Sequence, residues 1–314
     1  MSEKLEALLH RIRLSRAKEG DPKETLHALL EEIQQATGYS GRDSWNIMVE
    51  LIADYLGIIK DPWHYSLPGF QNEPLFKGRE ALNKQSFKIS ERALKVKERC
   101  AELVEMYVES ARQHPWDHLG EVFMEQGLQG RNLGQMLTPR SVVEFMVKSV
   151  LTEYDKTDEQ IWVDSETILW ANEYIERYGY FPFWARGPVE EALKTIEAYA
   201  KPKTVLDPAV GTGRFLIGAS LMYPKAPLVL FGIEIDLSLY RACLVNMAVF
   251  SHHPYSIICA DTLMIDEKYA NATSPIWDMG NLWEPPNFSP FYWKEPPITA
   301  EKFSLSEWLK IKHG

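Results

Sequence analysis

The stretch DPAVGTGRFL, at residues 207–216, decides the fold that we expect for this chain. It places two glycines, Gly211 and Gly213, between an apolar run that ends at Leu206 and a segment, Phe215–Met222, with apolar residues at helical spacing. Such a bend lets the backbone of a Rossmann-type βα unit turn sharply and approach a nucleotide-like ligand. On its own, the glycine pair also fits an ordinary βα turn of another doubly wound protein.

The next segment along the chain is typical of a second strand. Leu228–Ile235 is a continuous apolar run, the pattern of a parallel strand buried on both faces, and it ends at Glu234 and Asp236. An acid at the tip of a parallel strand can accept hydrogen bonds from both hydroxyls of a ribose. The alternative for either acid is a solvated strand end.

A third strand is expected after the helical stretch Leu237–Phe250. The short apolar run Ser256–Ala260 ends at Asp261 and Thr262. An acid there can accept an amino hydrogen of adenine, whereas an Asp-Thr pair also makes a good helix N-cap. Three successive strand ends thus present glycines, an acid and a second acid.

These segments resemble the cofactor-binding motifs of S-adenosylmethionine-dependent DNA adenine-N6 methyltransferases, in particular those of the modification subunits of type I restriction systems. The stretches that resemble the family are DPAVGTGRFL (207–216), FGIEID (231–236), ADTL (260–263) and, upstream, Leu119-Gly120 with Phe123 and GQMLTP (134–139). The resemblance implies an α/β fold with a Rossmann-like methyltransferase sheet.

The resemblance also implies S-adenosylmethionine as the cofactor. In the family, the Thr-Pro segment closes over the methionine end, the glycine loop holds the carboxylate side, and the acids after the second and third strands hold ribose and adenine. The implied cofactor-binding residues here are Thr138, Pro139, Asp207, Pro208, Ala209, Gly211, Thr212, Gly213, Glu234, Asp236, Asp261 and Thr262. Because the sulfonium is already an activated methyl donor, no metal is expected.

The segment expected to hold the target base departs from the family pattern. The family places an Asn or Asp, two prolines and an aromatic residue after the fourth strand, where they bind a base flipped out of the duplex. Here Glu284 precedes Pro285 and Pro286, and the aromatic Phe288 comes one place late. The implied catalytic residues are these four and Asn281, an alternative acceptor of amino hydrogens. A rigid surface turn is the competing interpretation of the proline pair.

We expect two domains and a shortened sheet. The N-terminal helical domain spans residues 1–115, and a methyltransferase-like domain spans 116–314 with an acidic helical insertion at about 151–200. In the family further strands follow the proline pair, but only 26 residues follow Phe288, and one βα unit takes about thirty. The helices expected outside the sheet are Glu3–Lys18, Lys23–Ala36, Ser44–Gly57, Ser86–Arg112 and Ser165–Tyr178.

Composition narrows the class of protein. A hydrophobic content of 45% in 314 residues suffices for packed cores. The three cysteines lack CxxC spacing, so we expect neither disulfides nor a zinc site, and a cytoplasmic location. No apolar run approaches the roughly 20 residues that span a bilayer. The net charge of −10 argues against coating nucleic acid by charge alone, although a local groove can still be basic.

Two regions are candidate partner surfaces. The insertion at 151–200 is acidic, and a dense aromatic run follows its expected helix, so it is either a surface helical insert or a docking surface. The aromatic C-terminal tail either stacks on nucleobases or covers an open edge of the sheet.

The sequence therefore predicts an S-adenosylmethionine-dependent adenine-N6 methyltransferase that acts on DNA as a modification-like subunit, with a partner or specificity subunit for target recognition. The altered proline motif favours a second hypothesis, a catalytically inactive binding or regulatory module associated with a phage or mobile element. A third hypothesis, methylation of RNA or protein, shares the same cofactor half.

Overall fold

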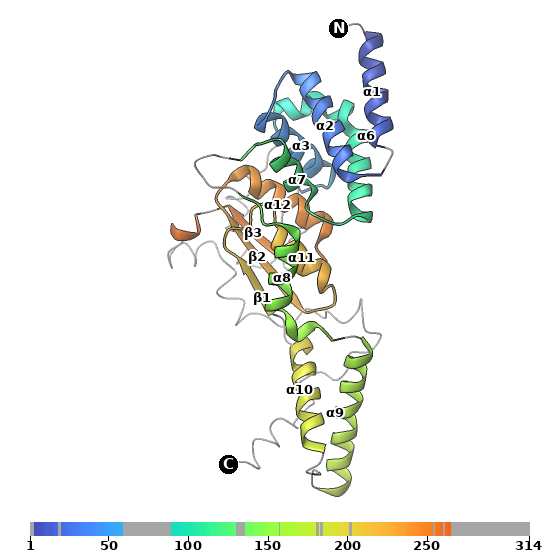
Figure 1. Cartoon of the computed structure of the whole chain (residues 1–314), viewed down its shortest axis with the longest axis vertical. Helices are drawn as coiled ribbons and strands as arrows, with labels where there is room; N and C mark the ends of the chain where they lie inside the picture. The colour runs from blue at the N-terminus through green and yellow to red at the C-terminus, as the bar shows by residue number, and fades with distance from the viewer. Residues whose placement is uncertain are drawn as a thin grey trace.

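A computed structural model describes residues 3–17, 20–58, 89–129, 136–156, 158–179, 182, 185–200, 203–253, 255–259 and 261–264. These residues form mostly helices and one small parallel sheet. In Figure 1 a helical bundle lies at the N-terminal end, the sheet lies in the middle, and a long helical hairpin extends from the opposite end. This is consistent with an α/β methyltransferase-like fold.

The bundle consists of helices that were predicted from the sequence. They are α1 (Glu3–Ala17), α2 (Pro22–Thr37), α3 (Arg42–Tyr55) and α6 (Glu91–Gln113). Asp21 caps α2 by accepting a hydrogen bond from Lys23 N at 2.8 Å, and Pro22 occupies the first turn. Helix α2 is central, because it packs against α1, α3 and α6. The four predictions are confirmed, with ends that differ by a few residues.

A buried carboxylate joins three helices of this bundle. Glu32 on α2 is fully buried and forms ion pairs with Arg13 of α1 and Arg99 of α6. Burial alone raises the pKa of Glu32, but hydrogen bonds from Arg99 and Arg13 outweigh burial and lower that pKa. Glu32 is therefore charged, and a charge can be buried at this position because two guanidinium groups pair with it.

The sheet contains three described strands, all parallel, in the order β1 (Lys203–Asp207), β2 (Leu228–Glu234) and β3 (Tyr255–Cys259). Helix α11 (Arg214–Met222) connects the first two strands, and α12 (Leu237–Phe250) connects the last two. Because such crossovers are right-handed and the strand order advances in one direction, both helices cover the same face of the sheet (Figure 1). Every residue of β2 is buried, as its continuous apolar sequence predicts.

Two helices that were not predicted connect the bundle to the sheet. Helix α7 (His118–Glu125) packs against α2, and α8 (Arg140–Val150) packs against α11. Gly218 of α11 permits this close approach, since an added Cβ would lie 2.6 Å from Val143 Cγ1. One continuous hydrophobic core extends from the bundle through these helices to β3. The structure therefore does not separate two domains between residues 115 and 116, since both parts share one core. This boundary stays a prediction.

The residues of the predicted insertion contain two long helices, whereas one helix was predicted from the sequence. Helix α9 (Asp158–Tyr178) begins earlier than the predicted Ser165, and α10 (Arg186–Ala200) was not predicted. Gly187 and Pro188 suggest a break, yet a proline is tolerated in the first turn of a helix. The two helices share a small core of their own, and α10 meets the short 3₁₀ helix η1 (Thr152–Tyr154).

No helix within the described ranges is long and apolar enough to cross a membrane.

The turn between α12 and β3 contains a buried histidine whose ionisation is coupled to folding. The Nε2 atom of His253 lies 2.9 Å from the carbonyl oxygen of Tyr223, which only accepts, so Nε2 donates. Burial lowers the pKa of His253 from 6.5 to about 4. Stability from the neutral ring is therefore present above the unfolded pKa and is lost as the pH falls toward the folded one.

We expect His253→Gln, which keeps an N–H donor for Tyr223 but does not titrate, to flatten this acid dependence. Between about pH 7 and about pH 4.5, its free energy of unfolding should fall by about 2 kcal/mol less than that of the wild-type chain. Urea denaturation at both pH values measures the difference. An equal decrease in the two proteins would contradict the role assigned to the ring.

Candidate functional site

The carboxyl ends of the three strands lie at one edge of the sheet, and the segments that follow them contact one another. The glycine loop (207–213) follows β1, and its Gly211 N donates to Glu234 Oε2, at the end of β2, at 2.8 Å. The hydroxyl of Thr262, just after β3, donates to the carbonyl oxygen of Pro208 in the same loop. The structure therefore brings together the three strand ends that the sequence singled out.

The two glycines of this loop have left-handed backbones. Gly211 has a φ of 57° and Gly213 a φ of 94°, which side chains rarely adopt. An added Cβ would lie 3.1 Å from Leu137 Cδ2 at the first position and 3.0 Å from Cys243 Sγ at the second. The sequence alone suggested ligand approach as the reason for glycine here. The structure adds a second reason, because the protein's own atoms pack this closely on the loop.

The predicted Thr-Pro segment is a neighbour of the glycine loop. Arg214, the first residue of α11, donates from Nη1 to the carbonyl oxygen of Thr138 at 3.0 Å. The carbonyl of Pro139 accepts from Val142 N and Val143 N, both at 3.0 Å, and so begins α8. Thr138 and Arg214, which lie 76 residues apart in the sequence, thus meet where the resemblance implies a shared ligand.

Two carboxylates at this edge have acceptor capacity left. Asp207 Oδ1 accepts from Ala209 N at 3.1 Å, and Glu234 accepts from Gly211 N and, at 2.8 Å, from Asp236 N. Burial raises the pKa of both carboxyl groups, and these backbone N–H groups oppose the shift. A carboxylate has about four acceptor positions, so each group can accept further donors.

The other two predicted acids make local structural contacts. Asp236 caps α12 by accepting from Ser238 N at 2.9 Å, and its second oxygen accepts from Arg42 Nη2 of α3, also at 2.9 Å. Asp261 accepts from Leu263 N at 3.0 Å, the hydrogen bond of the N-cap alternative. The Asp236 oxygens thus hold two helices, α12 and α3, whereas the Glu234 oxygens accept from backbone N–H groups of the glycine loop and of the segment after β2.

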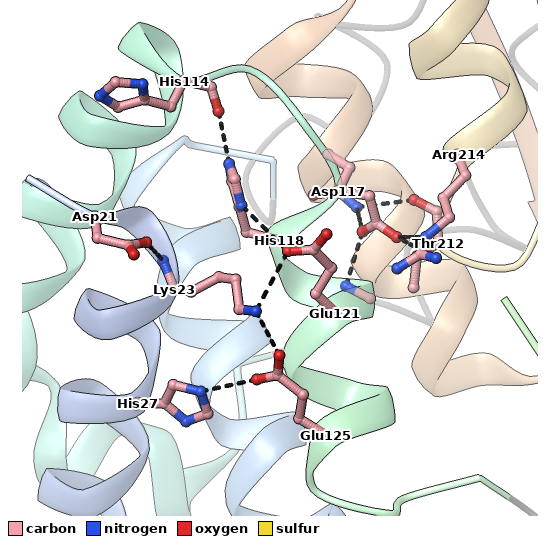
Figure 2. Close-up of polar contacts among 12 residues, drawn as sticks. Asp21, Lys23, His27, His114, Asp117, His118, Glu121, Glu125, Thr212 and Arg214 are labelled. Atoms are coloured by element: carbon pink, nitrogen blue, oxygen red, sulfur yellow. Dashed lines mark hydrogen bonds and ion pairs between the residues drawn. The ribbon is translucent and has the colours of Figure 1, made fainter. Parts of the chain in front are cut away.

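The most connected polar group beside the glycine loop was not predicted from the sequence. Asp117 is fully buried at the start of α7 and accepts four hydrogen bonds, three of them from side chains (Figure 2). The donors are Gly120 N at 2.8 Å, Thr212 Oγ1 at 2.5 Å, Arg214 Nε at 2.6 Å and Asn246 Nδ2 at 2.7 Å. Asp117 therefore joins α7, the glycine loop, α11 and α12.

Burial raises the pKa of Asp117, and the Arg214 guanidinium is the main group that opposes the shift. The four donors all need an acceptor, which suits the carboxylate form. Gly120 is required beside it, because an added Cβ would lie 1.9 Å from Asp117 Oδ2. The only local signal in the sequence is an Asp three residues before this glycine, in an N-cap position.

A second group of ion pairs holds α7 against α2. Lys23 pairs with Glu125 and lies 3.8 Å from Glu121, and His27 Nε2 lies 3.0 Å from Glu125 (Figure 2). These side chains are partly exposed, so the pairs stabilise the fold only weakly. They help to orient α7, the helix that Asp117 caps.

The predicted catalytic residues lie outside the described residues. They are Asn281, Glu284, Pro285, Pro286 and Phe288. Within the part of the chain that the structure describes, no group of three or more His, Cys, Asp or Glu side chains is arranged to hold a metal ion. The three cysteines are free thiols, and burial raises the pKa of Cys243, beneath the glycine loop, well above its usual value.

Comparison with protein families bears on this part of the chain. Residues 183–306 match the family model of the N-6 DNA methylases. The N-6 DNA methylase match includes all three strands, the glycine loop, Glu234 and the predicted catalytic positions, and it supports the adenine-N6 methyltransferase family. It begins after the Thr-Pro segment, whose likeness to the family rests on the sequence resemblance. No curated protein and no solved structure matches the chain.

Removing the buried acceptor at Asp117 should lower the free energy of unfolding much more than removing an exposed acceptor. We expect Asp117→Ala to lower the free energy of unfolding by about 3–5 kcal/mol, because it removes the acceptor of the Arg214 Nε–H and of one Asn246 amide hydrogen and leaves the guanidinium charge without its carboxylate. The control is Asp155→Ala, which removes an exposed acceptor of the Tyr223 hydroxyl and should cost about 1 kcal/mol. Urea unfolding compares the two, and equal costs would show that Asp117 is not a central link.

Proposed function

We propose that this chain binds S-adenosylmethionine at the sheet edge where β1, β2 and β3 end, and that it transfers the methyl group to N6 of adenine in DNA. The observation on which this rests is the meeting of the glycine loop, Glu234 and the Thr138 segment inside or beside the region that matches the N-6 DNA methylases. The family match is also the support for DNA as the substrate.

The residues at this edge suit such a cofactor. Glu234 accepts two backbone N–H groups and has capacity for the ribose hydroxyls, while Asp207 and the exposed Thr138 border the same loop. We assign Pro139, Pro208, Ala209, Gly211, Gly213, Asp261 and Thr262 to the surrounding wall. Thr212 and Asp236 support the site indirectly, because their side chains bond to Asp117 and to the start of α12.

The cofactor would supply an activated methyl group, so the chain's task is mainly to position the two reactants. By resemblance, Glu284 or Asn281 accepts the amino hydrogens of adenine, Phe288 stacks on the base, and the proline pair keeps the segment rigid. Glutamate has one methylene more than the family's aspartate, which moves the acceptor by about a bond length.

We further propose that the chain works like a modification subunit of a type I restriction system, in which another subunit selects the DNA site. The net charge of −10 supports this, because binding to DNA depends mostly on positive charge. The altered proline motif supports a second candidate, a methyltransferase-like module that binds the cofactor without catalysis. Transfer to RNA or protein is a third.

Calorimetric titration with S-adenosylmethionine tests the cofactor assignment. We expect the wild-type chain to bind, and Glu234→Gln to weaken binding by about tenfold or more, since it replaces a charged acceptor by a neutral amide. The matched control is Asp236→Asn, two residues away, which should change affinity less than about threefold because that side chain faces α12 and Arg42.

An absence of heat change at about millimolar cofactor would defeat the cofactor proposal. Equal losses for the two substitutions would show instead that the cofactor is bound but that the acid was chosen wrongly.

Transfer of a labelled methyl group to unmethylated DNA, followed by nucleoside analysis, tests the reaction. We expect N6-methyladenine, and we expect Glu284→Ala to abolish it while leaving cofactor affinity within about twofold. Glu295→Ala is a close control, because Glu295 also precedes two prolines, Pro296 and Pro297, and should retain activity. Cofactor binding without transfer to any DNA would favour the inactive module, and label in RNA or protein would favour the third candidate.

A further inference from the structure

The helical hairpin presents a long face of α9 away from α10. Ile168 and Ala171 of α9 pack with Val189 and Ala192 of α10 in the core of the hairpin. On the opposite side of α9, large apolar side chains are exposed to solvent: Trp162 by 50%, Val163 by 56%, Leu169 by 41% and Trp170 by 38%. Figure 1 shows the hairpin extending from the sheet, away from the bundle. We call this side of α9, with its exposed acids Glu159, Glu166 and Glu173, the outer face.

The outer face has a regular seven-residue spacing. Trp162 and Leu169 form one row along the helix axis, and Val163 and Trp170 form another, because seven residues make about two helical turns. At 100° per residue, a third row of three exposed acids lies between them, formed by Glu159, Glu166 and Glu173. All three rows run along one side of α9, so a helix that packs along this side would contact both apolar rows and the carboxylates between them.

The acids of this row have no cationic partner within the described part of the chain. In the hairpin, Glu191 of α10 forms ion pairs with Lys156 and Lys194. Residues 158–200 contain nine Asp and Glu but three Lys and Arg, so the hairpin has a net charge of −6. A partner that covers the apolar rows also desolvates the carboxylates, and it must then supply positive charge.

The charge of the outer face distinguishes among the molecules that could bind to it. Two copies of α9 placed face to face would bring like carboxylate rows together, which is repulsive. Nucleic acid is repelled by the same row. We propose that the outer face of α9 docks a helix of a partner protein, and that this helix has apolar residues in heptad rows with a row of Lys or Arg between them.

Two designed peptides as long as α9 test the proposal with the full chain. Both are helical with leucine rows at seven-residue spacing, and the row between the leucines is lysine in one and glutamate in the other. By fluorescence anisotropy, we expect the lysine peptide to bind with a dissociation constant on the order of 10 µM and the glutamate peptide not to bind. Trp162→Ala/Leu169→Ala should weaken binding by about tenfold while leaving the melting temperature unchanged.

Charge reversal on the row gives the sharpest comparison. Glu166→Lys/Glu173→Lys should weaken binding of the lysine peptide by about tenfold or more and allow the glutamate peptide to bind. The matched control, Glu102→Lys/Glu190→Lys, makes the same change in net charge at two exposed acids away from the row, and it should leave both affinities within about twofold.

Three results would overturn the proposal. They are equal binding of the two peptides, equal weakening by the row and control variants, and self-association of the chain that Trp162→Ala/Leu169→Ala abolishes in sedimentation velocity.

Discussion

The geometry of the sheet edge depends on the buried carboxylate of Asp117. It accepts from the glycine loop, from the first residue of α11 and from the middle of α12, and it also caps α7. A carboxylate without these donors could not be buried there, and without the carboxylate the Arg214 Nε–H and one amide hydrogen of Asn246 would lose their acceptor. The position of the loop therefore depends on a residue from the helical half of the chain.

The helices before the sheet are consequently part of the candidate site. Arg214 joins Asp117 to the Thr138 segment, and Arg42 of α3 contacts Asp236 at the end of β2. Across the same boundary, Arg241 of α12 pairs with the buried Glu50 of α3 at 3.1 Å. The core is continuous between these elements, so a change in the bundle is expected to alter the loops at the sheet edge.

The strands and the glycine loop could be predicted because their signals are local. The buried run Leu228–Glu234 and the bend at Gly211 can each be recognised from a stretch of about ten residues. Asp117 could not be predicted in the same way, since its partners Thr212 and Asn246 lie 95 and 129 residues further along the chain. Helix α10 was missed because Gly187 and Pro188 suggest a break. The sequence offered the N-cap role for Asp261 as one of two interpretations, and the choice between them, like the cap role of Asp236, depends on side-chain directions that sequence spacing does not determine.

Hydrogen exchange with and without S-adenosylmethionine is the most direct test that the Thr-Pro segment, the glycine loop and the end of β2 form one binding site. We predict that the cofactor slows exchange together in residues 136–139, 207–214 and 233–236, and that it leaves the hairpin of α9 and α10 unchanged. Protection confined to one of these segments, or found elsewhere while these three exchange as before, would contradict the account.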